Sequence, residues 1–218
     1  MRAIEVKHLT VAYGSRRIIS DFSFAVESGE AILLKGPSGC GKSTFLHAVC
    51  GLIPGSIQAG ISGEVLLFGR DIHTLSAAER AGEIGIVFQN PETQLFCDCV
   101  EDEIAFGLEN LCTPRDEIGR RIDEMLALTG LERYRFASPK ELSGGQKQLV
   151  VLAAVLAPDR KILLLDEALS QLDDSGKKAL AARLLALRRK GCTLLMAGHD
   201  GELASVAGRV VDLEEAWA

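Results

Sequence analysis

Residues 36–43 of the chain read Gly36-Pro37-Ser38-Gly39-Cys40-Gly41-Lys42-Ser43. The run matches the phosphate-loop pattern G-x-x-x-x-G-K-[ST]. An apolar stretch at 31–34 precedes it and reads as a buried strand, and residues 44–50 read as a helix. Backbone N–H groups at such a junction can surround phosphate oxygens, and the helix dipole favours anions. We predict that the run from Gly36 to Thr44 binds a nucleotide, with Lys42 reaching the β- and γ-phosphates and Ser43 binding Mg²⁺.

A metal ion beside phosphates needs a carboxylate, and residues 161–167 supply two. Four apolar residues, 162–165, read as a buried strand that ends in Asp166 and Glu167. Asp166 is the predicted Mg²⁺ ligand, and Glu167 is placed to polarise the water that attacks the γ-phosphate. The alternative reading is that the two acids are only a polar strand end.

A second glycine-rich motif stands at residues 142–146, which read Leu142-Ser143-Gly144-Gly145-Gln146. A serine followed three residues later by a glutamine is a capping box, typical of the start of a helix. Two successive glycines cost helix stability, so capping alone does not explain them. They would leave backbone N–H groups open to an anion. We therefore predict a second anion site formed by Ser143, Gly144, Gly145 and Gln146.

Length, charge and composition narrow the class of protein. A chain of 218 residues is long enough for one large domain with its own core. The net charge of −6 argues against a nucleic-acid partner, which favours a basic face. The longest apolar run, 149–157, is about half the length that crosses a bilayer, and the N-terminus has no export signal. The six cysteines, including the pair Cys97 and Cys99, lack disulfide or zinc spacing and suit a reducing cytosol.

Hydrophobic periodicity predicts an α/β architecture. Period-two alternation near residues 4–6 and 22–26 indicates antiparallel strands, and residues 90–157 are helical in pattern. Further strands are expected at 64–68, 84–88, 162–165, 193–197 and 210–213, with a helix at 180–187. We predict a single domain over 1–218, with a phosphate-loop core at about 1–89 and 158–218. An N-terminal antiparallel β subdomain belongs to this core, and an α-helical subdomain is inserted at about 90–157.

Phosphate-loop and acidic-strand motifs alone leave kinases, GTPases and helicases open, and the motif at 142–146 decides among them. With it, the sequence resembles the ATP-binding cassette (ABC) ATPases along its whole length, which implies a RecA-like core. The resemblance implies that Tyr13 stacks on adenine, that Gln89 contacts metal and water, and that His199 holds the γ-phosphate. Residues 170–173 resemble the segment that crosses between subunits.

The resemblance also implies the mechanism. Two copies, or two homologous chains, would form a head-to-tail dimer in which the phosphate loop of one and the signature turn of the other enclose each ATP. ATP and Mg²⁺ are the expected cofactors, and Lys42, Gln89, Glu167 and His199 are the expected catalytic residues. The chain departs from the family at Ala168-Leu169, where Pro-Thr is usual, and at Leu149, where a basic residue is usual. Neither position carries phosphate chemistry, so an active ATPase is expected.

Residues 88–96 and 100–107 indicate a subgroup within the ABC ATPases. They resemble the ATPases of energy-coupling-factor importers and of the related cobalt and nickel importers, many of which carry a further C-terminal domain. This implies an integral membrane coupling subunit, a substrate-binding membrane subunit and a peripheral location on the cytoplasmic face of the membrane. The apolar residues Leu95, Phe96 and Phe106 would contact the partner, unless they only pack the helical insertion. The alternatives are an ABC ATPase of another transporter subgroup, a soluble ABC ATPase, and a regulator that binds nucleotide without turnover.

Overall fold

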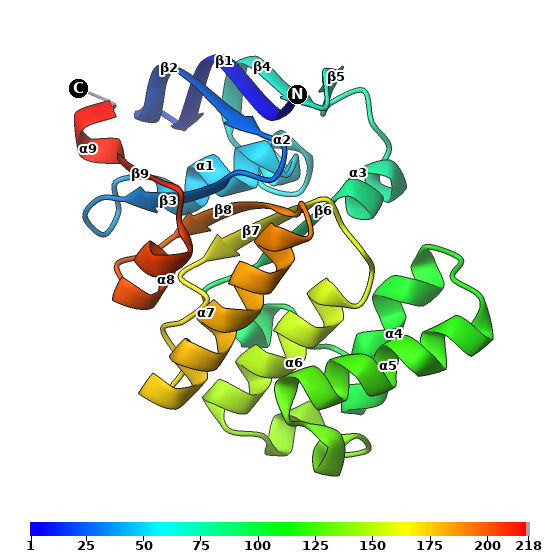
Figure 1. Ribbon diagram of the computed structural model, residues 1–218. Helices are drawn as coiled ribbons and strands as arrows, with labels where there is room; N and C mark the ends of the chain where they lie inside the picture. The colour runs from blue at the N-terminus through cyan, green and yellow to red at the C-terminus, as the bar shows by residue number, and fades with distance from the viewer. Residues whose placement is uncertain (217–218) are drawn as a thin grey trace.

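The computed structural model describes residues 1–216 and contains two β-sheets with helices between and below them (Figure 1). The first sheet is antiparallel and has the order β2-β1-β4-β5. Its strands are β1 (Arg2–Tyr13), β2 (Arg16–Glu27), β4 (Gly60–Leu67) and β5 (Arg70–Asp71). Ile4 pairs with Val26 and Val6 with Phe24, and these residues face the core, as the period-two alternation predicts. The last two residues of the predicted domain lie outside the described part of the chain.

The second sheet is parallel and has the order β6-β7-β8-β3-β9. Its strands are β3 (Ala31–Lys35), β6 (Ile84–Val87), β7 (Ile162–Asp166), β8 (Thr193–Ala197) and β9 (Arg209–Asp212). Strands β7 and β8 are buried along their whole length, which explains their continuous apolar sequence. The carboxyl ends of β3 and β7 lie at one edge of the sheet, where α/β proteins bind ligands.

Helices cover both faces of the parallel sheet (Figure 1). Between the two sheets lies α1 (Lys42–Val49), whose Phe45 packs edge-on against Phe22 and Phe24. The other helices and helical turns are α2 (Leu52–Gly55), α3 (Ala77–Glu83), η1 (Pro91–Thr93), α4 (Val100–Asn110), α5 (Arg115–Thr129), η2 (Glu132–Tyr134), η3 (Pro139–Glu141), α6 (Gly144–Leu156), α7 (Asp174–Arg189), α8 (Gly201–Val206) and α9 (Leu213–Ala216). Helices α4, α5 and α6 share a separate apolar core, so the α/β fold class with an inserted helical part is confirmed.

Four short helices, α2, α3, α8 and α9, are absent from the sequence prediction. Helix α3 has no buried side chain, so it lacks the apolar stripe by which helices are recognised. Its signal is a capping box instead: the Ser76 side chain accepts from Glu79 N, and Glu79 Oε2 accepts from Ser76 N at 2.8 Å. No helix within residues 1–216 combines the length and apolarity that a bilayer crossing requires.

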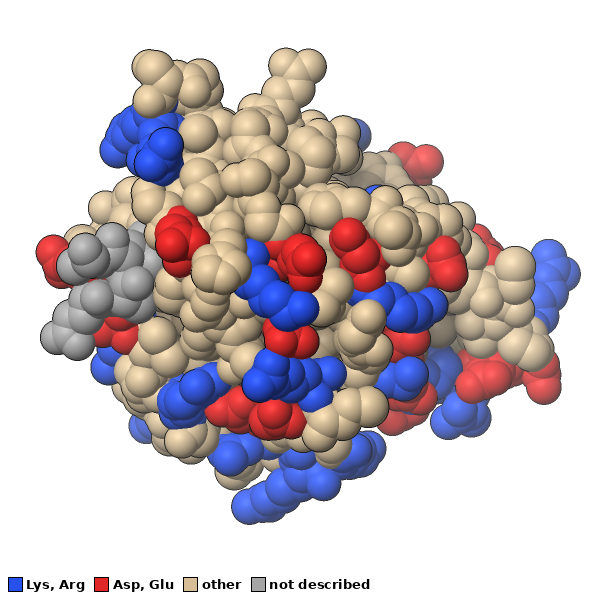
Figure 2. Space-filling model, turned by 90° about the horizontal axis from the view of Figure 1, so that it is seen from above, with Lys and Arg blue, Asp and Glu red and all other residues tan. Residues whose placement is uncertain are grey.

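The outer face of the antiparallel sheet carries charges of both signs. Figure 2 shows them interspersed rather than gathered by sign. Several are ion-paired, among them Lys7 with Glu64 at 3.1 Å and the N-terminal amine with Glu27 at 3.0 Å. Exposed pairs of this kind contribute little to stability, and opposite charges so close together cancel each other's field.

Candidate nucleotide site

The phosphate loop leaves β3 and enters α1 in a conformation that requires glycine. Gly36 has a φ of 146°, and a Cβ on it would lie 2.7 Å from Cys40 Sγ. Gly41, the residue before α1, has a φ of 102° and provides no side-chain cap. The first N–H groups of α1 are therefore free of a side-chain acceptor, which leaves them for an anion.

Lys42 is held inside the loop. Its side chain is 5% exposed, and Nζ donates to the carbonyl oxygens of Gly36 at 2.9 Å and Pro37 at 3.1 Å. Nζ also lies 3.8 Å from Glu167 Oε1. The ammonium group is thus fixed at the base of the loop by two neutral acceptors and one carboxylate.

Glu167 and Gln89 come from different strand ends and meet beside the loop. Gln89 Nε2 donates to Glu167 Oε2 at 2.8 Å. Glu167 has a φ of 47°, a left-handed conformation that is uncommon for a residue other than glycine and often found at functional sites. The turn after β7 thereby aims the carboxylate at Lys42 and Gln89.

Asp166, the preceding residue, has a buried side chain at the carboxyl end of β7. Its Oδ1 has no hydrogen-bond partner in the described part of the chain. Burial raises the pKa of this carboxyl, and a hydrogen bond from the Ser43 side chain opposes that rise. A buried carboxylate oxygen without a donor, beside a hydroxyl group, is a donor set that a hard divalent cation fits.

A cavity of about 330 Å³ brings together eight of the eighteen predicted site residues; Gly36, Pro37, Cys40 and Asp166 do not line it. It is lined by Arg16, Ile18, Ser38, Gly39, Gly41, Lys42, Ser43, Thr44, Gln89 and Glu167. Arg16 and Ile18 are absent from the sequence prediction. Both lie at the start of β2, where Arg16 pairs with Tyr13, and this closeness to the predicted adenine-stacking residue is the signal that could have found them. Tyr13 and His199 do not line the cavity, and His199 is exposed after β8. Their roles stay predictions.

The signature turn lies elsewhere in the chain. Ser143 Oγ accepts from Gln146 N at 3.3 Å, and Gln146 Oε1 accepts from Ser143 N at 2.9 Å, so the predicted capping box is present. Helix α6, which it starts, packs on the face of the parallel sheet opposite α1 (Figure 1). None of the residues 143–146 lines the phosphate-loop cavity. A single chain therefore does not bring the two predicted anion sites together in this cavity.

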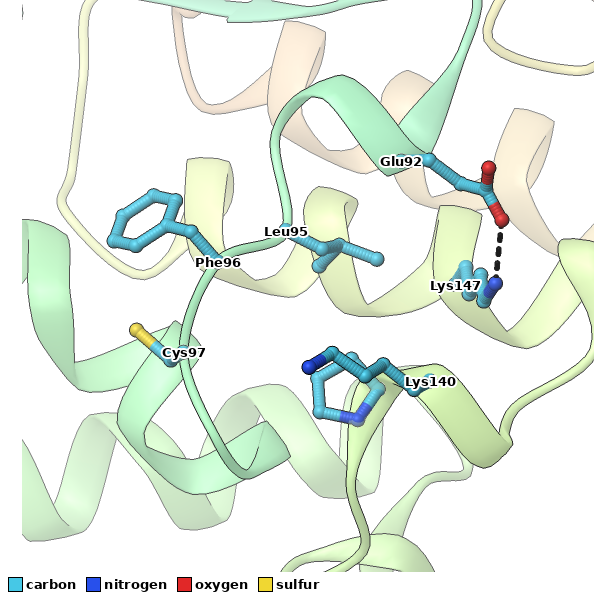
Figure 3. A pocket seen from close by; sticks show the side chains of 7 residues that line it. Glu92, Leu95, Phe96, Cys97, Lys140 and Lys147 are labelled. Carbon is cyan, nitrogen blue, oxygen red and sulfur yellow. Dashed lines mark hydrogen bonds and ion pairs between the residues drawn. The ribbon is translucent and has the colours of Figure 1, made fainter.

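A second hollow, of about 200 Å³, lies beside the segment that follows Gln89 (Figure 3). Its lining residues are Glu92, Leu95, Phe96, Cys97, Pro139, Lys140 and Lys147, which we call the docking pocket. Lys147 pairs with Glu92 at 2.6 Å on one rim, and Phe96 lies on the opposite rim (Figure 3). Phe96 and Phe106 are 63% and 45% exposed, and their rings meet edge-on with centroids 4.6 Å apart.

Two side chains that sequence reasoning missed hold this segment in place. Gln94 Oε1 accepts from Phe88 N at 2.7 Å, next to Gln89. The buried carboxylate of Glu103 accepts from the N–H groups of Phe96 at 3.0 Å and Cys97 at 2.8 Å. Hydrogen bonds to a charged acceptor are the stronger kind, so the backbone between Gln89 and the docking pocket is held at both ends by side-chain hydrogen bonds.

Comparisons with known proteins agree with this geometry. Residues 19–170 match the family described as ABC transporter. A putative ABC transporter ATP-binding protein of Methanosarcina acetivorans is 39% identical over 97% of this chain and 34% of its own length. The energy-coupling factor transporter ATP-binding protein EcfA1 of Leuconostoc mesenteroides is 35% identical over 99% of this chain and 78% of its own length. The chain thus spans about a third of some curated relatives and most of others.

Solved structures give the same result. The ATP-binding cassette MJ0796 bound to ADP and Pi superposes with a TM-score of 0.86 at 26% identity, covering 96% of this chain and 93% of that one. The protein cbiO1 of Clostridium perfringens, described as part of the ABC transporter complex cbiONQ, has a TM-score of 0.81 at 30% identity, covering 97% and 84%. The family resemblance predicted from the motifs is confirmed. The chain belongs to the ABC transporter family of ATP-binding cassette proteins.

Proposed function

We propose that this chain is the ATP-hydrolysing subunit of a membrane importer of the energy-coupling-factor type, and that it works as a head-to-tail dimer. The main support for ATP hydrolysis is the position of Glu167. Its carboxylate is held by Gln89 at 2.8 Å and lies 3.8 Å from the buried ammonium of Lys42, on the wall of the phosphate-loop cavity. A carboxylate so placed can hold and deprotonate a water molecule beside bound phosphate.

The chemical step follows from these contacts. Water attacks the γ-phosphorus in line with the leaving ADP, its oxygen bonds to phosphorus, and the bond to the bridging oxygen breaks. Glu167 accepts the proton of the water, and Lys42 balances charge on the phosphate oxygens. His199 would hold the γ-phosphate from the end of β8, and Tyr13 would stack on adenine near the β1–β2 hairpin.

The donor set of Ser43, Gln89 and Asp166 would hold Mg²⁺. The buried Oδ1 of Asp166 is without a hydrogen-bond partner among the described residues, and Ser43 and Gln89 line the cavity beside it. When bound, the cation neutralises charge on the phosphate oxygens. The oxygen atoms of these three side chains would be its protein ligands.

A second subunit would complete each ATP site. The signature turn at 143–146 offers N–H groups but does not line the cavity of its own chain. Head-to-tail pairing places the turn of one subunit over the phosphates held by the other. The dimer therefore closes only when ATP bridges both surfaces.

The docking pocket supports the transport role. Exposed aromatic rings next to a hollow are typical of a surface that binds another protein. Gln94, next to Leu95 of the pocket, is hydrogen-bonded to the backbone of Phe88, next to Gln89. A membrane subunit seated in the pocket would therefore be coupled to Glu167 through Gln89. The likeness to EcfA1 and cbiO1 supports an importer of the energy-coupling-factor type. The chain would then lie on the cytoplasmic face of the membrane without crossing it.

Affinity purification of the tagged chain from native membranes tests this proposal. We expect integral membrane proteins, including a coupling subunit, to co-purify, and the purified complex to release phosphate from ATP. A chain that releases phosphate but never co-purifies with a membrane protein would contradict the importer role and leave the ATPase. If neither the isolated chain nor the purified complex releases phosphate from bound ATP, both the importer role and the ATPase activity are contradicted.

A further inference from the structure

Gln148 lies in the middle of α6 and is buried without a partner. Its side chain is 1% exposed, and neither Oε1 nor Nε2 hydrogen-bonds to another group within residues 1–216. A buried amide that gives up water without gaining a partner destabilises the fold. Gln94 is the contrasting case, because its Oε1 accepts from Phe88 N at 2.7 Å and its Nε2 donates to Ile86 O at 3.0 Å. The amide of Gln148 therefore does not serve the stability of the single chain.

Helical spacing puts Gln148 on the face of α6 that contacts residues 168–172, a stretch that overlaps the segment 170–173 and that we call the crossing segment from here on. In a helix a side chain leans toward the N-terminus and covers the preceding turn, which here contains Gly144 and Gly145. A Cβ on Gly145 would lie only 3.2 Å from the carbonyl oxygen of Gln171. Apolar residues of α6 and of the crossing segment also share one buried cluster: Val151, Leu152, Ala168, Leu169 and Leu172.

The crossing segment is connected directly to Glu167. Ser170 N donates to Glu167 O at 3.0 Å, and Leu172 N donates to Leu169 O at 3.0 Å, so the segment is a pair of tight turns. It begins at the left-handed conformation of Glu167, where φ is 47°. A displacement of this segment therefore changes both the surroundings of Glu167 and the contact with α6.

We infer that Gln148 is a positioning residue, whose amide hydrogen-bonds to the backbone of the crossing segment when two copies close over ATP. The inference rests on the proposed head-to-tail dimer. In the single chain the amide is unpaired, and closure moves the crossing segment into reach of it. The hydrogen bonds gained then favour the ATP-bound dimer and hold Glu167 in place relative to the signature turn of the same chain.

Gln148→Met tests this, because methionine has a similar shape and no polar group to bury. In the absence of nucleotide we expect the melting temperature to rise by about 2–4 °C. In a Glu167→Gln background, which retains ATP, we expect the ATP-dependent dimer to weaken about tenfold, as for the loss of one hydrogen bond. ATP binding by the single chain should not change. Gln94→Met is the matched control: it unpairs Phe88 N and Ile86 O, so its melting temperature should fall.

The outcomes separate this inference from the proposed function. If the Glu167→Gln parent forms no dimer with ATP, the proposed function and the inference both fail. If the parent forms the dimer and Gln148→Met dimerises as tightly as the parent, the inference alone is wrong. A lower melting temperature for Gln148→Met also overturns it, because the amide is then already satisfied in the single chain.

Discussion

Two helices of this molecule begin at glycine-rich turns, and the turns differ in how far they are open to an anion. Helix α1 starts after Gly41, with no side-chain cap and with the ammonium of Lys42 folded under the loop. Helix α6 starts after Ser143, and its N–H groups are partly used by the capping box with Gln146. The phosphate loop also lines a cavity, whereas the signature turn does not line that cavity.

This difference suggests an order of events. The phosphate loop has free backbone N–H donors, the buried ammonium group of Lys42 and a cavity, so a single chain can bind ATP there. In the signature turn the Ser143 side chain already accepts from the N–H group of Gln146, so fewer free donors remain there for phosphate than in the phosphate loop. It is therefore expected to bind only ATP that is already held by a partner.

The largest effect is expected in the phosphate-loop cavity, from the substitution Glu167→Gln. Turnover should fall by roughly 10²–10⁴-fold, about 3–5 kcal/mol of barrier, because the amide cannot accept the proton of the attacking water. ATP should still bind, and the variant should collect as an ATP-held dimer on size exclusion. Phosphate release and nucleotide titration measure the two effects. Glu117→Gln, on the exposed side of α5, is the control. Unchanged turnover would remove Glu167 from the chemical step.

At the signature end, Gly145→Asp should lower turnover by about 10²–10³-fold, because a carboxylate would oppose the phosphate of the partner site. ATP binding to the same chain should persist. Gly145→Ala is the matched control for the added Cβ, which would lie 3.2 Å from Gln171 O. Mixing the Gly145→Asp chain with a Lys42→Ala chain leaves one intact site in the heterodimer, so some activity should return. Full activity of Gly145→Asp alone would contradict the second anion site.

A smaller effect is expected where the nucleotide is not touched. Replacing Phe96 and Phe106 together by serine should release the chain from membranes and leave its ATP affinity nearly unchanged. The rings are 63% and 45% exposed, so about one ring's worth of surface is left to bury against a partner, which contributes roughly 1.5–3 kcal/mol. Phe136→Ser is the control, because Phe136 is 77% exposed and lies outside the docking pocket. Membrane fractionation gives the readout, and a double variant that still sediments with membranes would contradict the docking role.

The strand-and-loop part of the site could be predicted from the sequence because its signals are local. A buried strand, a glycine-rich loop and a helix follow one another within residues 31–50, and each has its own composition rule. The acids Asp166 and Glu167 end a continuous apolar strand, which again is local. The ABC family and the fold class, which were predicted from these local signals, are confirmed by the family match and by the solved structures.

The remaining features depend on contacts between distant residues. Gln89 and Glu167 are joined by a hydrogen bond across 78 positions, and no short pattern encodes it. Arg16 and Ile18 reach the cavity through the pairing of β1 with β2. The unpaired amide of Gln148 could not be predicted from the sequence, because helical spacing shows only that Gln148 belongs to α6 and not whether its side chain has a partner.

The smallest predicted effect sharpens the comparison of the two turns most directly. Ser143→Ala removes the cap of α6, so the free energy of unfolding without nucleotide should fall by about 0.5–2 kcal/mol. Ser38→Ala in the phosphate loop should leave it unchanged, because the Ser38 side chain is exposed and makes no hydrogen bond within residues 1–216. Thermal unfolding of the two variants side by side measures this. If Ser143→Ala is as stable as Ser38→Ala, the capping box does not hold the signature turn, and the N–H group of Gln146 is then as free for an anion as the donors of the phosphate loop.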